Sequence, residues 1–203
     1  MATLILVRHG NSAWNKLGLW TGKTDVDLTA EGRDEARKAG ELIRDITIGR
    51  AYVSSLCRTH QTLDALREGY GKAIPEPTKD HALDERDYGS YTGKNKWEVK
   101  EEIGEEEFTK LRRNFDHPVP EGETLKDVYR RVVPYYERVI RPELVAGENV
   151  IVVSHGNTLR ALVKYLEHVA DDRISEVEIA TGEVLCYQID KEGNVGMRET
   201  RGT

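Results

Sequence analysis

The chain has 203 residues, a formal net charge of −6 and 33% charged residues. This length predicts a single domain over residues 1–203, and the acidic balance argues against nucleic acid and anionic membrane surfaces as partners. No stretch approaches the roughly 18 apolar residues of a membrane span, and two cysteines are typical of a reduced intracellular protein. The N-terminal apolar run is short and ends in Arg8, so we expect no secretory leader and a cytoplasmic location.

The first half of the chain alternates short apolar runs with helical patterns. A threonine at position 29 is placed to cap the first of these helices. In chain order, the pattern predicts a buried strand over residues 3–7, a polar loop over 11–27, a helix over 30–45, a parallel strand over 51–55, a helix over 58–68 and, because of its prolines, at most an edge strand over 74–77.

The second half begins with a segment that we interpret as a small helical cap inserted over the main sheet, at about residues 94–120. Thr124 and Asp127 resemble a capping box, and Pro134 is expected to kink the helix that they start. In chain order, the pattern predicts a long helix over residues 124–144, a buried strand over 150–153, a helix over 158–169 and two final strands near 184–187 and 195–197. Together these elements predict a three-layer α/β fold with a mostly parallel sheet.

Two of the predicted strands end in a His-Gly pair, at His9-Gly10 and His155-Gly156. The carboxyl ends of parallel strands are where open α/β sheets bind ligands, and glycine lets a ligand approach the backbone closely. Arg8, and Arg58 after another strand, would complete a cationic pocket whose guanidinium groups match phosphate. The free amides of the helix that begins after His155 would add to this anion site. A lone histidine at a strand end is more often structural, but the repeated pair favours a functional site.

A neutral imidazole at His9 can attack phosphorus and form a phosphohistidine, which divides one phosphoryl transfer into two displacements. Glu85 is our candidate proton donor and acceptor, because a carboxyl group beside bound phosphate keeps its proton more readily. Local alternatives exist for these residues. Arg58 could be a surface residue at a helix start, Glu85 could belong to a solvated charge cluster, and Arg112-Arg113 could complement a helix dipole.

The six histidines show no close pair at ligand spacing, and neither cysteine has a second one nearby. The sequence therefore predicts no metal site. It also lacks the Gly-x-x-x-x-Gly-Lys-Ser/Thr and Gly-x-Gly-x-x-Gly patterns, so it does not indicate a nucleotide-binding fold.

Over nearly its whole length the chain resembles the histidine phosphatase superfamily, and within it the 2,3-bisphosphoglycerate-dependent phosphoglycerate mutases. The Arg8-His9-Gly10 motif marks only the superfamily, whereas other segments are more specific to the mutases. The matching segments are residues 8–15 for the first phosphate loop, 21–22 and 25–29 after it, 85–89 for the general-acid loop, 93–96, the arginine pair 112–113, and 154–166.

This resemblance implies a phosphoglycerate mutase-like fold and interconversion of 3-phosphoglycerate and 2-phosphoglycerate, primed by 2,3-bisphosphoglycerate without metal. The implied catalytic residues are His9 as nucleophile, Glu85 as proton donor and acceptor, and Arg8, Arg58 and His155 around the phosphoryl group. The implied substrate-binding residues are Gly10, Asn11, Ser12, Asn15, Thr21, Gly22, Arg86, Tyr88, Lys96, Arg112, Arg113, Gly156 and Asn157. The implied partners are small phosphorylated glycerates, and a homodimer is compatible with the resemblance.

The sequence departs from the family pattern at three places. Asn11 replaces the usual glutamate, the stretch between Arg113 and Thr124 is shorter than in the longer mutases, and only a short segment follows Met197. The last departure predicts a less covered site and a larger share of hydrolysis. Two alternatives therefore stay open: a phosphomonoesterase of the same superfamily, and a catalytically silent module that binds phosphorylated ligands.

Overall fold

The computed structural model describes residues 1–202 and is organised around a six-stranded sheet in the order β3-β2-β4-β1-β5-β6. Strands β3, β2, β4 and β1 are parallel neighbours, and β5 and β6 extend the sheet by antiparallel pairing. The strands are β1 (Ala2–Arg8), β2 (Arg50–Val53), β3 (Thr78–Lys79), β4 (Val150–Ser154), β5 (Val184–Ile189) and β6 (Val195–Arg201). The predicted α/β class with a mostly parallel sheet is confirmed.

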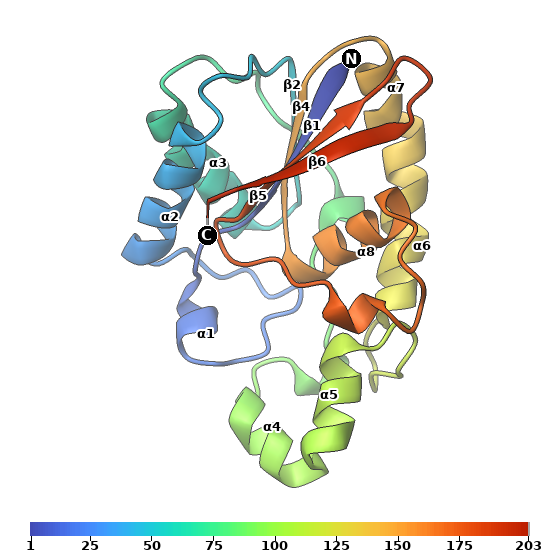
Figure 1. Ribbon diagram of the computed structural model, residues 1–203. Helices are drawn as coiled ribbons and strands as arrows, with labels where there is room; N and C mark the ends of the chain where they lie inside the picture. The colour runs from blue at the N-terminus through green and yellow to red at the C-terminus, as the bar shows by residue number, and fades with distance from the viewer. Residues whose placement is uncertain (203) are drawn as a thin grey trace.

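Helices cover both faces of this sheet, which gives the predicted three layers (Figure 1). Strand β4 is apolar from Val150 to Val153 and fully buried, as a strand covered on both faces must be. On β1, alternate side chains point to opposite layers. Leu4 and Leu6 join the core on the side of α6 (Leu125–Tyr135), α7 (Arg141–Val145) and α8 (Gly156–Leu166), whereas Ile5 and Val7 join the core beneath α2 (Ala30–Glu41) and α3 (Cys57–Tyr70).

Local capping explains where several helices begin. The Thr29 side chain accepts a hydrogen bond from the Gly32 N–H, and Thr124 with Asp127 forms a complete capping box, as predicted. The predicted helix over 124–144 is interrupted by a π-helical turn, Tyr136–Ile140. This turn lies between Pro134 and Pro142, each of which removes a backbone donor from the helical ladder.

The predicted cap segment folds as two helices, α4 (Lys96–Ile103) and α5 (Glu105–Arg113), which we call the cap helices. Gly104 separates them with a φ of 82°, a conformation that glycine adopts without strain. The cap helices lie beyond the carboxyl ends of β1, β2 and β4 (Figure 1). They share a small apolar core with Trp20, formed by Trp20, Val99, Phe108, Leu111 and Val119.

Several predicted boundaries were wrong. The loop over 11–27 contains a short helix, α1 (Ala13–Lys16), and the edge strand lies at Thr78–Lys79 rather than 74–77. Strand β6 continues to Arg201, α2 ends at Glu41, and α8 starts at Gly156 and ends at Leu166. Short 3-10 turns occur at His81–Leu83, Gly89–Tyr91 and Ile174–Glu176. None of the helices within residues 1–202 is long and apolar enough to cross a membrane.

Candidate active site

The carboxyl ends of β2, β4 and β1 meet at one edge of the sheet, because these three strands are parallel neighbours. The His9 N–H donates to the Ser154 carbonyl oxygen at 2.9 Å, and the His9 and His155 ring centroids lie 5.0 Å apart. A cavity of about 120 Å³ opens at this edge. Its walls are formed by Arg8, His9, Asn15, Trp20, Thr21, Gly22, Arg58, Glu85, Tyr88, Lys96, Arg112, Arg113, Gly156, Asn157, Arg160, Glu178 and Ile179.

His9 is buried, and its tautomer is set by one contact. Its Nδ1 lies 2.7 Å from the Gly10 carbonyl oxygen, which can only accept a hydrogen bond, so Nδ1 carries the proton. Burial, followed by the charges of Arg58 and Arg8, holds the pKa of His9 well below its ordinary value. The ring is therefore neutral near pH 7 and presents an unprotonated Nε2, which is the state that a nucleophile requires.

His155 has a different environment, although it follows a strand in the same way. The Arg58 Nε–H donates to His155 Nδ1 at 3.2 Å, so His155 Nε2 carries the proton and donates to Ser54 Oγ at 2.8 Å. Both ring nitrogens are thus engaged, and burial holds the pKa of His155 well below its ordinary value. Among the described residues, His155 lies behind the cavity wall rather than in it. The structure thus brings the two imidazoles together, but both nitrogens of His155 are engaged by the protein, and its predicted contact with the phosphoryl group stays a prediction.

The two predicted phosphate arginines are held by backbone carbonyl groups. Arg58 is fully buried, and its guanidinium group donates to the Thr24 and Gly22 carbonyl oxygens at 2.9 and 2.8 Å. Arg8 donates to the Ile179 carbonyl oxygen at 2.5 Å and packs against Gly156, where a Cβ atom would lie 3.4 Å from the Arg8 guanidinium carbon. These contacts fix both cations at the end of the sheet before any ligand binds.

Three buried donors of the cavity wall have no hydrogen-bond partner within residues 1–202. They are Arg8 Nε, Trp20 Nε1 and the Thr21 hydroxyl. Buried polar groups are almost always paired, so unpaired donors in a cavity point to a ligand that accepts hydrogen bonds. Six of the wall residues are cationic and two are acidic, which fits a polyanionic ligand.

Glu85 lies in this wall because its loop is bound to the end of β4. The Ser154 hydroxyl donates to the Leu83 carbonyl oxygen at 2.7 Å, and the Thr158 hydroxyl donates to the Asp84 carbonyl oxygen at 2.5 Å. Glu85 Oε1 accepts hydrogen bonds from the backbone N–H groups of Arg86, at 2.8 Å, and Asn157, at 3.3 Å. One carboxylate oxygen is therefore anchored, and the other is left to exchange a proton with a ligand.

A second group of polar side chains faces the cavity from the side of the cap helices. Lys96, Arg112 and Arg113 come from α4 and α5. Tyr88 is held by the Asn157 side chain, whose Nδ2 donates to the Tyr88 hydroxyl oxygen at 2.8 Å. Burial, together with the charges of Arg112 and Arg8, lowers the pKa of Lys96 to about 8. We call Lys96, Arg112 and Arg113 the distal cations.

Four predicted substrate-binding residues do not line the cavity within the part of the chain that the structure describes. Gly10 packs against α2, where a Cβ atom would collide with the Gly32 backbone. The Asn11 N–H donates to Glu35, and Ser12 caps α1, where it binds Asn15 Oδ1 and so positions Asn15 in the wall.

The fourth residue, Arg86, is fully buried beneath Tyr88, with its guanidinium carbon 5.2 Å from the centre of that ring. Its Nε donates to the Glu123 carbonyl oxygen at 2.6 Å. Burial therefore places its charge behind the cavity wall, and the prediction that it faces the substrate is not matched by the geometry.

The cavity also contains residues that the sequence did not single out as site residues, namely Trp20, Arg160, Glu178 and Ile179. Arg160 is buried on α8, donates to Asn157 Oδ1 at 3.1 Å, and binds the carbonyl oxygens of Arg112 and Arg113 at 3.3 and 3.0 Å. The sequence could have indicated Arg160 as a site residue, because it follows Asn157 by three positions and residues three apart share a helix face. Within residues 1–202, no three His, Cys, Asp or Glu side chains lie together as a metal site needs.

Comparison with known proteins agrees with this geometry. Residues 4–199 match the histidine phosphatase superfamily (branch 1). A protein of Parvibaculum lavamentivorans named 2,3-bisphosphoglycerate-dependent phosphoglycerate mutase is 41% identical over 97% of this chain and 94% of its own length. A protein of the same name from Tropheryma whipplei is 42% identical, over 95% of this chain and 96% of its own length.

Solved structures share the fold at lower sequence identity. Bacillus stearothermophilus YhfR is 25% identical, with a TM-score of 0.84 over 97% of this chain and 95% of its own. A putative alpha-ribazole-5'-P phosphatase from Escherichia coli is 20% identical, with a TM-score of 0.82 over 100% of this chain and 96% of its own, and shows likeness of fold alone. The chain thus belongs to the histidine phosphatase superfamily and, within it, to the family of 2,3-bisphosphoglycerate-dependent phosphoglycerate mutases.

Proposed function

We propose that this protein interconverts 3-phosphoglycerate and 2-phosphoglycerate through a phosphohistidine on His9. The observation that carries the proposal is the two-ended cavity: an unprotonated histidine nitrogen lies at the sheet edge, and the distal cations face it from the cap helices. A phosphomonoesterase needs only the first end. A mutase must also hold the other charged end of its substrate while the phosphoryl group changes position. The names of relatives about 40% identical to this chain support the same activity.

Each transfer can be followed at the atoms of this chain. Phosphorylated His9 gives its phosphoryl group to the free hydroxyl of the bound monophosphoglycerate, so that the N–P bond breaks, a new P–O bond forms, and Glu85 accepts the hydroxyl proton. His9 Nε2 then attacks the phosphoryl group carried by the oxygen of the neighbouring carbon, so that this P–O bond breaks, an N–P bond forms, and Glu85 returns the proton to the oxygen that leaves. Arg8 and Arg58 stabilise the charge that spreads over the equatorial oxygens during each displacement.

The priming step is part of the proposal. When bound, 2,3-bisphosphoglycerate supplies the phosphoryl group that charges His9. The cationic wall and the unpaired donors of Arg8, Trp20 and Thr21 fit such a polyanion. The cap insertion at residues 94–120 in a single domain, a homodimer and a cytoplasmic location stay predictions of the sequence.

A product assay tests the function directly. In the presence of EDTA, the protein should convert 3-phosphoglycerate to 2-phosphoglycerate when a trace of 2,3-bisphosphoglycerate is added. Without the bisphosphate, the conversion should be much slower. Metal should not be required, because the proposed charge stabilisation comes from arginines. Phosphorus NMR would follow both isomers and inorganic phosphate together. Release of phosphate faster than isomerisation would favour the phosphomonoesterase, and neither product would favour the silent binding module.

The pH dependence should report the state of Lys96. Its lowered pKa means that Lys96 is charged below a pH of about 8 and loses its charge above it. We therefore expect kcat/KM for 3-phosphoglycerate to fall as the pH rises through about 8. In a Lys96→Arg variant the side chain stays charged, so the profile should remain level over the same range. A fall of equal size in that variant would assign the titration to another group.

A further inference from the structure

Glu178 is an unexpected carboxylate in a cavity that otherwise suits anions. It is one of only two acidic residues in the wall within residues 1–202, and Glu85, the other, has a proposed role in proton transfer. The Arg113 guanidinium group donates to Glu178 Oε1 at 2.7 Å. This hydrogen bond, together with the charge of Arg113, lowers the pKa of Glu178, so the carboxylate is ionised at neutral pH.

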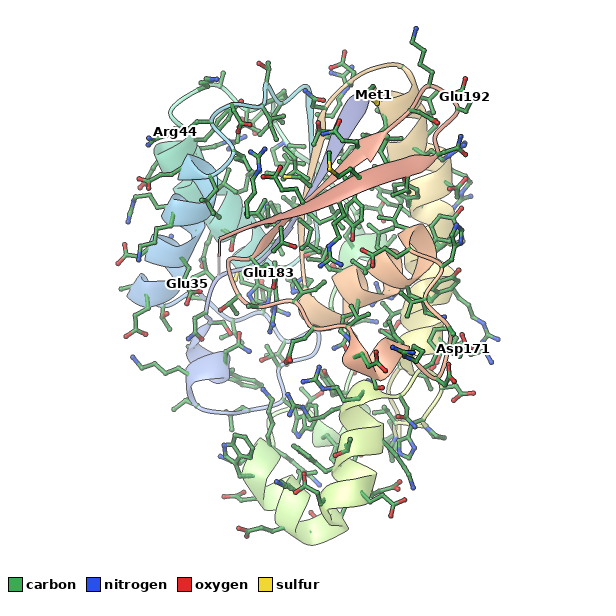
Figure 2. The ribbon with its side chains drawn as sticks, in the orientation of Figure 1. Met1, Glu35, Arg44, Asp171, Glu183 and Glu192 are labelled. Carbon is green, nitrogen blue, oxygen red and sulfur yellow. The ribbon has the colours of Figure 1, made fainter. Side chains whose placement is uncertain are left out.

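The backbone around Glu178 is held, whereas its side chain is open to solvent. Arg160 Nε donates to the Val177 carbonyl oxygen at 2.9 Å, and Arg8 Nη1 donates to the Ile179 carbonyl oxygen at 2.5 Å. Between Asp171 and Glu183, which are labelled in Figure 2, the chain runs below α8 and above the cap helix α5. The Glu178 side chain is 71% exposed and that of Arg113 is 24% exposed. The carboxylate can therefore leave Arg113 and enter water without disturbing the fold.

We propose that Glu178 is a built-in counter-ion that competes with the distal anionic group of the substrate for Arg113. This inference rests on the proposed function, which makes Arg113 a distal cation. An arriving carboxylate or phosphate can bind Arg113 only after Glu178 has released it. Glu178 thereby weakens the binding of two-ended anions and has little effect on a small anion held only at His9. It is a specificity-determining residue, since it changes the preference between these two classes of ligand.

The test is a Glu178→Gln variant, with Glu178→Ala in parallel because glutamine can still accept a hydrogen bond from Arg113. The dissociation constant of 2,3-bisphosphoglycerate, measured by calorimetry, should fall by about two- to fivefold in both variants, the range that an exposed ion pair supplies. The dissociation constant of vanadate, which needs only the His9 end, should change by much less. The KM for 3-phosphoglycerate should fall together with the dissociation constant of the bisphosphate.

Glu176→Gln is the matched control. It removes the same charge two residues earlier, where Glu176 pairs with Arg173 at 2.6 Å outside the cavity wall. It should leave both dissociation constants unchanged. Unchanged or weaker bisphosphate binding by the Glu178 variants would overturn the proposal. So would a Glu176→Gln variant that binds the bisphosphate equally more tightly, or Glu178 variants that bind vanadate more tightly by the same factor as the bisphosphate. A parent protein that binds the bisphosphate without isomerising 3-phosphoglycerate would defeat the proposed function but not this inference, whereas absence of binding would defeat both.

Discussion

Replacement of His9 by alanine should abolish the phosphoprotein and lower kcat for isomerisation by about 10⁶-fold, the loss seen when a covalent enzyme loses its nucleophile. The reason is that His9 Nε2 is unprotonated and belongs to the cavity wall, while both nitrogens of His155 are engaged by Arg58 and Ser54. Brief incubation with labelled 2,3-bisphosphoglycerate should place an acid-labile, base-stable label on the parent protein and none on the variant.

Two further variants make this result specific. His168→Asn alters a histidine after the end of α8, outside the cavity wall, and keeps a residue type that tolerates the φ of 52° there. It should label and turn over like the parent. His155→Gln should still be labelled, but more slowly, because Arg58 loses one of its three supports. Label that appears on His155 in the His9→Ala protein would show that the nucleophile has been misassigned.

The strands of the central sheet could be predicted because burial on both faces demands an uninterrupted apolar run. Residues 150–153 satisfy this demand, and so does the run before Arg8. The boundaries of helices and strands that were predicted wrongly depend on contacts with other parts of the chain. Helix α1 exists because Ser12 and Asn15 cap it, and the two-residue strand β3 is defined only by its pairing with β2. The π turn reflects two prolines acting on one helix, an effect that hydrophobic periodicity does not reveal.

The site was predictable where its residues follow strands, and less so where loops fold back on the sheet. His9, Arg8 and Gly156 sit at strand ends, so their placement follows from the parallel pairing of β1 with β4. A motif does not say which of its side chains face a cavity. Asn11, for example, is absent from the cavity wall, and its backbone N–H donates to Glu35. Glu178 was missed because it reaches the wall through Arg113, a residue 65 positions earlier in the chain.

Removal of a distal cation should separate isomerisation from simple hydrolysis. Arg112→Ala, and separately Lys96→Ala, should lower kcat/KM for 3-phosphoglycerate isomerisation by about 10²–10³-fold, or about 2.7–4 kcal/mol, the usual effect of removing one preorganised donor. Hydrolysis of a simple phosphomonoester through His9 should fall much less, because such a substrate has no second charged group to place against the cap helices. Both rates can be measured on the same preparation.

Lys110→Ala provides the matched control for charge. Lys110 lies on the same helix as Arg112, but its ammonium group pairs with Glu106 at 2.6 Å and does not belong to the cavity wall. Its loss should leave both rates within about twofold of the parent, since exposed ion pairs contribute little. If the distal cations serve only to raise the potential of the whole cavity, Arg112→Ala would slow hydrolysis and isomerisation by the same factor. A selective loss of isomerisation instead requires contact with the far end of the substrate, because the step at His9 is common to both reactions. That difference separates a mutase from a phosphomonoesterase built on the same sheet edge.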